Sequence, residues 1–264
     1  MAEFVPDEGL YAKLSGKVVV ITGGATGIGA ATTKLLAEHG AHIVVGDINK
    51  EAAIKTVEQL AGGHTYVETD QGNWFDPHLT IEGVREPGNT NVLDVNVFGT
   101  LNFARIATVF MRQDILNAGS KSLTLISSVN AFQDSPGLFL YQTSKHAVQG
   151  LLRSTRKTLY ERDGIRVNAV CPGVTDTPMT AAIIDAFRDN GLFWQSPESV
   201  AKIVLGLMTN EEMNGKAVYV EGGAGFEFED GLYAAQPHWL GQEATRRLRA
   251  NTEAVQKGIL VPKE

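Results

Sequence analysis

The sequence holds a single cysteine, Cys171, among its 264 residues. An internal disulfide is therefore impossible, which favours a reducing compartment and, by default, the cytoplasm. The chain also lacks any run of about 18 apolar residues, the length needed to span a bilayer. Its acidic beginning, residues 1–14, is unlike a signal peptide. We therefore expect neither a membrane span nor a secretory leader.

Positive charge is scarce as well. The chain has 23 Lys and Arg residues against 30 Asp and Glu residues, a formal net charge of −7. An acidic surface disfavours non-specific binding to nucleic acid or anionic lipid. His39 and His42 are three residues apart but lie at the end of an expected helix and the start of an expected strand, so no metal site is expected. This composition does not exclude a small anionic ligand, which needs only a local site.

Short β-branched runs alternate with helical segments along the chain. This alternation predicts a single-domain α/β fold over residues 1–264, a Rossmann-type doubly wound parallel sheet, with an N-terminal extension at 1–14 and a tail from about 226. The expected strands are 17–22, 41–46, 64–69, 122–127, 165–170 and 217–220. The expected helices are 30–39, 51–60, 92–111, 141–162, 197–208 with Ser196 as N-cap, and 242–257.

A glycine-rich loop, TGGATGIG, runs from Thr22 to Gly29 between the first expected strand and helix. Glycines at such a turn let the backbone approach a pyrophosphate, and the helix N-terminus offers free N–H groups and partial positive charge. A P-loop hydrolase is excluded because no lysine follows Gly29. The alternative is a turn that merely needs small residues. The candidate cofactor-binding residues here are Thr22, Gly23, Gly27, Ile28 and Gly29.

Two aspartates close the next expected strands. Asp47 ends the second strand, where a carboxylate accepts hydrogen bonds from ribose hydroxyls and repels a ribose phosphate. NAD is therefore favoured over NADP. Asp70 ends the third strand and could bond the adenine amino group. For both residues the alternative is a plain turn role at the end of a strand.

Ser128, Tyr141 and Lys145 form the candidate catalytic set. Tyr141 and Lys145 are four residues apart, which places them on one helix face, about 6 Å apart along the axis. Ser128 follows the end of an expected strand, where parallel-sheet enzymes build their sites. Reduction of a ketone leaves an alkoxide that a phenol can protonate, and a nearby ammonium lowers the pKa of a phenol. Alone, such a Tyr/Lys pair is commonly an exposed helix face; the glycine loop and Ser128 favour the catalytic interpretation.

These motifs together resemble the short-chain dehydrogenase/reductase family. The matching stretches are TGGATGIG, the strand-end Asp47, NVFG at 96–99, Ser127-Ser128, YQTSK and VCPGVTDT, over roughly residues 15–225. The resemblance implies that Tyr141 is the acid/base, Ser128 orients the substrate oxygen, and Lys145 binds the nicotinamide ribose. It also implies that Asn96 holds a water of a proton relay and that Thr177 bonds the nicotinamide carboxamide.

The chain is most similar to 15-hydroxyprostaglandin-dehydrogenase-like members, which oxidise secondary alcohols with NAD. Its stretch FEFEDGLYAAQPHWLG is similar to the tails of fungal members, many of which act in secondary-metabolite pathways. The resemblance implies an NAD(P)-dependent oxidoreductase that interconverts a secondary alcohol and a ketone on a hydrophobic small molecule. Because family members are commonly dimers or tetramers, a homodimer or homotetramer is expected.

The segment between Asp70 and Asn96 departs from the family pattern. Members place a helix, the fourth strand and an Asn-Asn-Ala-Gly turn there, and none is recognisable. Residues 79–84 are a candidate shortened strand, and the Asn-Ala-Gly at 117–119 is interpreted as a simple turn. The fourth strand is thus expected to be shortened or missing. Its loss would leave unpaired backbone groups and exposed apolar faces on its neighbours.

Three functions remain open at this point. The intact Ser128, Tyr141 and Lys145 favour a dehydrogenase. The shortened segment favours a catalytically weak or inactive nucleotide-binding scaffold of the same fold, and a redox-neutral enzyme such as an isomerase is a third alternative. Phe187, Phe193 and Trp194 are expected either to line a substrate lid or to serve ordinary helix packing.

Overall fold

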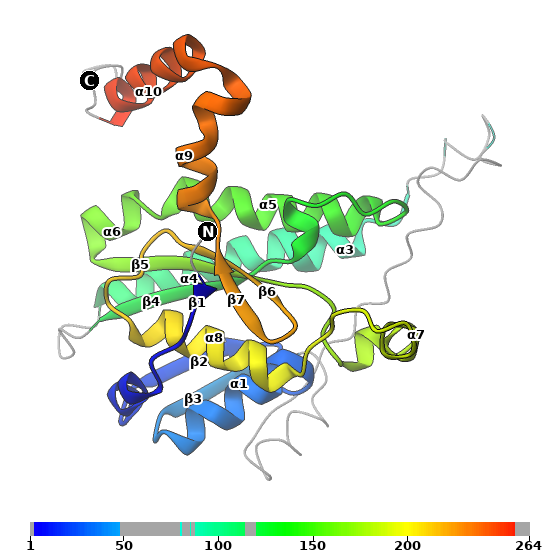
Figure 1. The fold of residues 1–264 in the computed structure, drawn as a ribbon. Coiled ribbons are helices and arrows are strands. Elements are labelled where there is room, and N and C mark those ends of the chain that lie inside the picture. Colours follow the sequence, from blue (N-terminus) through cyan, green and yellow to red (C-terminus); the bar gives the residue numbers. More distant parts are fainter. Residues whose placement is uncertain (1–2, 48–79, 81–84, 86–87, 114–119, 257–264) are drawn as a thin grey trace.

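The structure is a computed structural model that describes residues 3–47, 80, 85, 88–113 and 120–256 (Figure 1). Several expected features lie outside the described residues: Asp70, the helix at 51–60, the strand at 64–69, the candidate strand at 79–84 and the turn at 117–119. Among the described helices, none is both long and apolar enough to cross a bilayer.

A five-stranded sheet forms the centre of the described structure (Figure 1). Its order is β1-β7-β6-β5-β4, and β4, β5 and β6 are parallel. Beyond the expected parallel strands, β7 pairs antiparallel with β6 and β1 pairs antiparallel with β7. The tight hairpin between β6 and β7 is possible because Gly222 and Gly223 have φ angles of 58° and 84°, which glycine adopts without a steric penalty. The strands are β1 (Glu3–Phe4), β4 (Lys121–Ile126), β5 (Ile165–Pro172), β6 (Ala217–Glu221) and β7 (Ala224–Glu227).

The first half of the chain forms a separate two-stranded parallel ladder, β2 (Val18–Thr22) and β3 (His42–Gly46). Within the described residues, no hydrogen-bonded strand joins this ladder to β4, and the expectation of a shortened or missing fourth strand concerns a segment outside them. Apolar side chains on one face of the ladder are uncovered: Val18 is 68%, Val20 51% and Val44 54% exposed. The two strands are therefore fully paired with each other, but these apolar side chains on one face of the ladder are exposed.

Helices lie on both faces of the central sheet, which is the doubly wound arrangement. On one face, Leu123 and Val167 pack against Val148 and Leu152 of α5 (Phe139–Thr155). On the other face, the core is formed with α8 (Pro197–Thr209) and contains Val170, Val218, Val220, Val200 and Val204. Every residue of β5 is buried. The Rossmann-like α/β fold expected from the sequence is thus confirmed.

The remaining helices follow the expected ranges with two differences. The expected helix at 92–111 is divided into α3 (Asn91–Leu93), a π-helical turn η3 (Asp94–Gly99) and α4 (Thr100–Gln113). The expected helix at 141–162 is also wrong as one element, because α5 ends at Thr155 and α6 (Thr158–Asp163) follows. The Thr155 hydroxyl donates to the carbonyl of Leu151, a contact that competes with the helix ladder and bends helices.

The boundaries of α1 and α8 agree well with the sequence. Helix α1 (Gly27–Glu38) precedes Gly40, which has a φ of 76°. Helix α8 begins after Ser196, whose hydroxyl accepts the N–H of Ser199, as an N-cap residue does. The two helices pack on each other, and α8 thereby connects the β2–β3 ladder to the central sheet.

The two ends of the chain are more structured than expected. The presumed extension contains a 3₁₀ helix, η1 (Glu8–Leu14), whose Tyr11 is buried and donates to the carbonyl of Lys202 at 2.9 Å. The tail forms α9 (Glu229–Leu240) and α10 (Gln242–Gln256), which rise away from the sheet as an arm (Figure 1). A short α7 (Ile184–Asp189) precedes α8.

Candidate active site

The glycine loop has the tight geometry that a dinucleotide requires. A Cβ atom at Gly29 would lie 1.8 Å from the carbonyl oxygen of Gly23, so only glycine fits where α1 begins against the loop. The buried Thr33 hydroxyl donates to the carbonyl of Gly24 and holds the loop from inside. The Thr26 side chain makes no capping hydrogen bond, which leaves N–H groups of the first turn available to an anion.

The neighbouring cofactor candidates lie at the same edge. Gly23 donates its N–H to the carbonyl of Gly46 at 2.9 Å, and Asp47 follows directly after β3, at the same edge of the ladder. A Cβ at Gly27 would come within 2.8 Å of Thr177 Cγ2, which places Thr177 against the glycine loop. The structure therefore brings Thr22, Gly23, Gly27, Ile28, Gly29, Asp47 and Thr177 into one region, and these residues fit a dinucleotide.

The candidate catalytic residues meet at the carboxyl end of β4. Ser128 is buried and caps a 3₁₀ turn, η4 (Val129–Ala131), by accepting the N–H of Asn130 at 3.2 Å. This bond uses the oxygen of Ser128 and leaves its O–H proton able to donate to a substrate oxygen. The capping role thus also sets the direction of the hydroxyl.

Lys145 is tied to both β4 and Tyr141. Its Nζ donates to the carbonyl of Ile126 at 3.2 Å and lies 5.5 Å from the centroid of the Tyr141 ring. The Ser127 hydroxyl donates to the carbonyl of Lys145 at 3.1 Å. These bonds hold the first turns of α5 against the strand end that carries Ser128. The sequence pairing of Tyr141 with Lys145 therefore corresponds to a real juxtaposition.

Asn96 joins the same group from another helix. It lies in the π-helical turn η3, a type of turn that is frequent at functional sites. Its Nδ2 donates to the Ser144 hydroxyl at 3.0 Å, and that hydroxyl donates to the carbonyl of Tyr141 at 2.7 Å. Ser144 and Ser127, which sequence reasoning did not assign a role, are thus the residues that bind the catalytic candidates together. The sequence pointed to them only through their positions, since Ser144 directly precedes Lys145 and Ser127 directly precedes Ser128.

Cys171 lies directly behind this site. Burial raises the pKa of its thiol to about 12, although hydrogen bonds from Ser127 and Ser128 and the charge of Lys145 act in the opposite direction. Its Sγ contacts Gln149 Oε1 at 3.7 Å. The prediction that Cys171 is a small packed residue is therefore confirmed.

The three aromatic residues of the expected lid have different surroundings. Phe193 is 75% exposed and lies near Gly222, while Trp194 stacks under Arg188 at 4.7 Å. Phe187 belongs to α7. Neither lining nor simple packing describes all three. His39, considered earlier as a metal ligand, packs its ring edge-on against Tyr11 at 5.1 Å.

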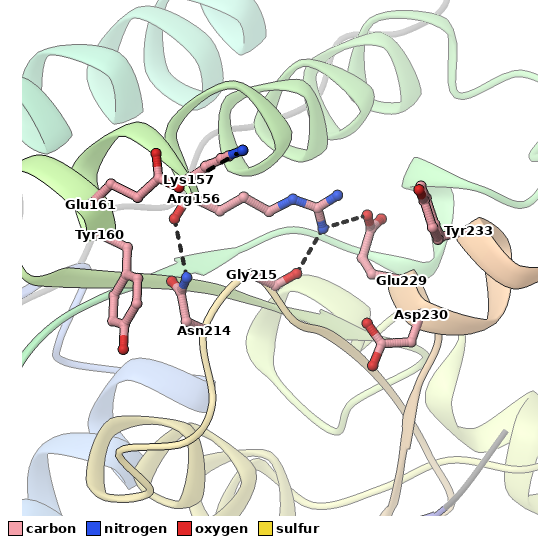
Figure 2. A pocket seen from close by; sticks show the side chains of 9 residues that line it. All are labelled: Arg156, Lys157, Tyr160, Glu161, Asn214, Gly215, Glu229, Asp230 and Tyr233. Carbon is pink, nitrogen blue, oxygen red and sulfur yellow. Dashed lines mark hydrogen bonds and ion pairs between the residues drawn. The ribbon is translucent and has the colours of Figure 1, made fainter. Parts of the chain in front are cut away.

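A hollow at the other end of α5 does not belong to this chemistry. Figure 2 shows its lining, in which Arg156 reaches Glu229 and the carbonyl of Gly215. Glu229 also binds Arg153 at 2.7 Å and Gln149 at 2.9 Å. Burial raises the pKa of Glu229, but these hydrogen bonds and the two arginine charges outweigh it and lower the pKa. The charged groups of this hollow therefore form ion pairs with one another, and these ion pairs hold the beginning of α9 against α5.

Comparison with known proteins agrees with this geometry. A family model for short chain dehydrogenases matches residues 17–86 and 79–187. The chain is 28% identical to 5'-hydroxyaverantin dehydrogenase of Dothistroma septosporum, over 92% of this chain and 95% of that protein. It is 30% identical to 3-alpha-(or 20-beta)-hydroxysteroid dehydrogenase of Mycobacterium tuberculosis, over 86% and 98%.

A solved structure shares the fold. The 3-ketoacyl-(acyl-carrier-protein) reductase of Brucella melitensis, complexed with NADH, aligns with a TM-score of 0.65 at 21% identity, covering 80% of this chain and 98% of that one. The glycine loop, the Ser128–Tyr141–Lys145 group and the matched family model all lead to one assignment: the chain belongs to the short-chain dehydrogenase family.

Proposed function

We propose that the protein is an NAD(P)-dependent oxidoreductase that interconverts a secondary alcohol and a ketone on a hydrophobic small molecule, with a role in fungal secondary metabolism. The observation that carries the proposal is the placement of Lys145, whose Nζ donates to the carbonyl of Ile126 at the end of β4, two residues before Ser128, and lies 5.5 Å from the centroid of the Tyr141 ring. Among its relatives, 5'-hydroxyaverantin dehydrogenase has a name that fits such a role. We also propose that, within the family, the chain is most similar to 15-hydroxyprostaglandin-dehydrogenase-like members.

The residues divide the work as follows. A nicotinamide cofactor, when bound, supplies or accepts the hydride. Ser128 donates its O–H to the substrate oxygen and holds it where charge develops. Tyr141 gives that oxygen a proton in reduction and takes one in oxidation, and the ammonium of Lys145 lies 5.5 Å from the centroid of its ring. Asn96, bonded to Ser144, connects the site to a path for the proton.

NAD is the proposed cofactor, with NADP less favoured. Asp47 follows β3, whose last residue, Gly46, accepts the N–H of Gly23 in the glycine loop, and a carboxylate there suits the ribose hydroxyls and would repel a ribose phosphate. The proposed assembly is a single domain that forms a homodimer or homotetramer in the cytoplasm, without nucleic acid, membrane or metal.

A second candidate is a nucleotide-binding scaffold with little or no catalytic activity. The observation that favours it is the uncovered ladder face of Val18, Val20 and Val44, next to a central sheet to which β2 is not hydrogen-bonded within the described residues. NADH fluorescence titration combined with a cofactor-depletion screen of alcohols and ketones separates the two. Binding with turnover supports the dehydrogenase, binding alone supports the scaffold, and no binding at millimolar NADH removes both.

The glycine loop gives a direct test of cofactor binding. Gly29→Ala should abolish NADH binding, because the new Cβ would meet the Gly23 carbonyl at 1.8 Å and force the loop open. Gly150→Ala is the matched control, since a Cβ there has no neighbour within 4 Å. NADH fluorescence of both variants checks this, and undiminished binding by Gly29→Ala would contradict the assignment of the loop.

A further inference from the structure

Tyr219 and Glu221, near the carboxyl end of β6, form a pair that the reaction above does not use. The Tyr219 hydroxyl donates to Glu221 Oε2 at 2.5 Å, and both side chains are partly exposed. Burial raises the pKa of Tyr219 above its usual range, and the hydrogen bond to Glu221 and its charge raise it further. Tyr219 is therefore a neutral donor, and it holds the carboxylate in one orientation.

The pair lies on the same sheet face as the catalytic helix. Tyr219 is the register partner of Cys171, whose thiol faces Gln149 of α5. Neighbouring residues in register point to the same face, and residues two apart along a strand share that face. Glu221 therefore also projects to the α5 side, one step nearer the edge where Ser128 lies.

Aromatic rings connect Ser128 to this pair. Phe132, which follows the turn capped by Ser128, lies 5.6 Å from the Tyr219 ring and is 42% exposed. Tyr219 in turn lies 6.3 Å from Phe226. We call Phe132, Tyr219 and Phe226 the aromatic ledge. The Phe132 and Tyr219 rings meet edge to face at 85°, so the ledge offers the edges and partly exposed faces of its rings to an apolar molecule whose other end reaches Ser128.

Glu221 is held firmly at the far end of the ledge. A Cβ at Gly173 would come within 2.3 Å of its Oε2, so the carboxylate lies directly against the backbone that follows β5. Gln195 donates to the carbonyl of Val220 at 3.0 Å and accepts the N–H of Gly223, which fixes the hairpin turn. Such preorganisation reduces the entropy lost when a ligand binds.

The register gives the span between the two ends. Ser127 donates its N–H to Val170, so Ser128 lies level with Pro172 and, one strand further, with Val220. Two strand spacings of about 4.8 Å and one residue along the strand put Glu221 about 10 Å from Ser128, measured along the backbone positions.

We propose that Glu221, oriented by Tyr219, accepts a hydrogen bond from a second hydroxyl group of the substrate, about 10 Å from the reacting carbon. The preferred substrate is then a polycyclic molecule with a remote hydroxyl donor. This inference rests on the proposed function, because Ser128 marks the reacting end. Glu221 is a specificity-determining residue and takes no part in the proton transfer.

Two matched steroid probes test the proposal. 5α-Androstane-3α,17β-diol carries a donor at its far end, whereas androsterone has a ketone there and the same 3α-hydroxyl. Binding of each is measured by calorimetry without added cofactor, so that the result does not depend on turnover. The wild-type protein should bind the diol about tenfold to a hundredfold more tightly, the range of a hydrogen bond to a charged group.

Variants test whether the carboxylate of Glu221 causes the preference for the diol. Glu221→Leu should remove the preference, Tyr219→Phe should weaken it, and Glu161→Leu, at an exposed position on α6, should retain it. Circular dichroism and thermal unfolding establish that each variant is folded. An unchanged preference in Glu221→Leu, equal binding of both probes, or binding of neither would overturn the proposal.

Two further outcomes are informative. Tighter binding of the 17β-amino analogue than of the diol would overturn the hydroxyl assignment in favour of a cation. A diol preference in a protein that turns over no substrate in the cofactor-depletion screen of alcohols and ketones would refute the proposed function while leaving the subsite in place.

Discussion

At the scale of single residues, the candidate chemistry depends on the position of one phenol and one ammonium. Lys145 is fixed by the Ile126 carbonyl, and Ser127 fixes the backbone of Lys145 in turn. The backbone carbonyl of Tyr141 accepts the hydroxyl of Ser144, which in turn accepts a hydrogen bond from Asn96. These bonds fix the backbone that carries both candidate residues.

Replacement of Tyr141 by Phe should lower kcat by at least about a hundredfold, because it removes the proton donor and acceptor. NADH affinity should remain nearly the same, since the ring and its contact with Lys145 are retained. Steady-state kinetics and NADH titration measure the two effects. Tyr160→Phe, at an exposed position on α6, is the control that should leave both quantities unchanged. Retained turnover in Tyr141→Phe would disprove the acid/base role.

Cys171 should be inert in the folded protein. Its pKa of about 12 leaves almost no thiolate at pH 8, and its side chain is completely buried. We expect alkylation by iodoacetamide at pH 8 to be at least about a thousandfold slower than in urea, where the thiol has its ordinary pKa near 8.5. Mass spectrometry of the labelled protein measures the rate. Rapid native labelling would show that the packing around β5 is looser than described.

At the scale of elements, the carboxylate of Glu229 joins α9 to α5. It is buried and bonded by Arg153, Arg156 and Gln149, which together lower its pKa. A carboxylate with a lowered pKa in the folded state adds stability above its unfolded pKa, and this contribution is lost as the pH falls through the folded value. The attachment of the arm should therefore weaken only in acid.

Glu229→Gln should lower the free energy of unfolding at pH 7 by about 2 kcal/mol. This is below the usual cost of breaking a buried ion pair because both arginines are partly exposed to water. As the pH falls below the ordinary carboxyl range and through the lowered pKa of Glu229 in the folded protein, the wild-type carboxylate becomes protonated, and the difference between the two proteins should shrink. Urea unfolding at pH 7 and pH 3.5 measures this, with the exposed Glu243→Gln as control. A difference independent of pH would contradict the ion-pair explanation.

Individual elements show why sequence reasoning succeeded in some places and failed in others. The strands at 18–22, 42–46 and 165–172 were predicted within two residues because compact β-branched runs bounded by glycine depend on local chemistry. The break between α5 and α6 and the π-helical turn at Asn96 were missed. Asn96 bonds the distant Ser144, a contact that no local pattern reveals. At the break between α5 and α6, the local bond of Thr155 to Leu151 is accompanied by bonds of Arg156 to the distant Gly215 and Glu229.

At the scale of the whole molecule, the described strands form two separate ladders. β5 lies between β4 and β6 and is wholly buried, whereas β2 pairs only with β3 within the described residues and exposes Val18 and Val20. Stability is therefore expected to be uneven, with the central sheet opening only on global unfolding.

Hydrogen exchange should reveal this difference. Amides of residues 165–172 should exchange at least about a hundredfold more slowly than those of 18–22, since the latter can open without unfolding the central sheet. Exchange measured by mass spectrometry at pH 7 tests the expectation. Saturating NADH should protect 18–29 and leave 165–172 unchanged. Equal protection of both strands in the free protein would show that the two ladders unfold together.

The sequence by itself determined the type of fold, the glycine loop and the identity of Ser128, Tyr141 and Lys145, because these depend on short-range patterns of residue type and spacing. The tertiary structure decided how Asn96, Ser127 and Ser144 bind that group together, that β7 runs antiparallel, and that Glu221 lies across the sheet from Ser128. Those relations join residues far apart in the chain. Only the packing of strands and helices brings their hydrogen-bonding groups within reach of one another.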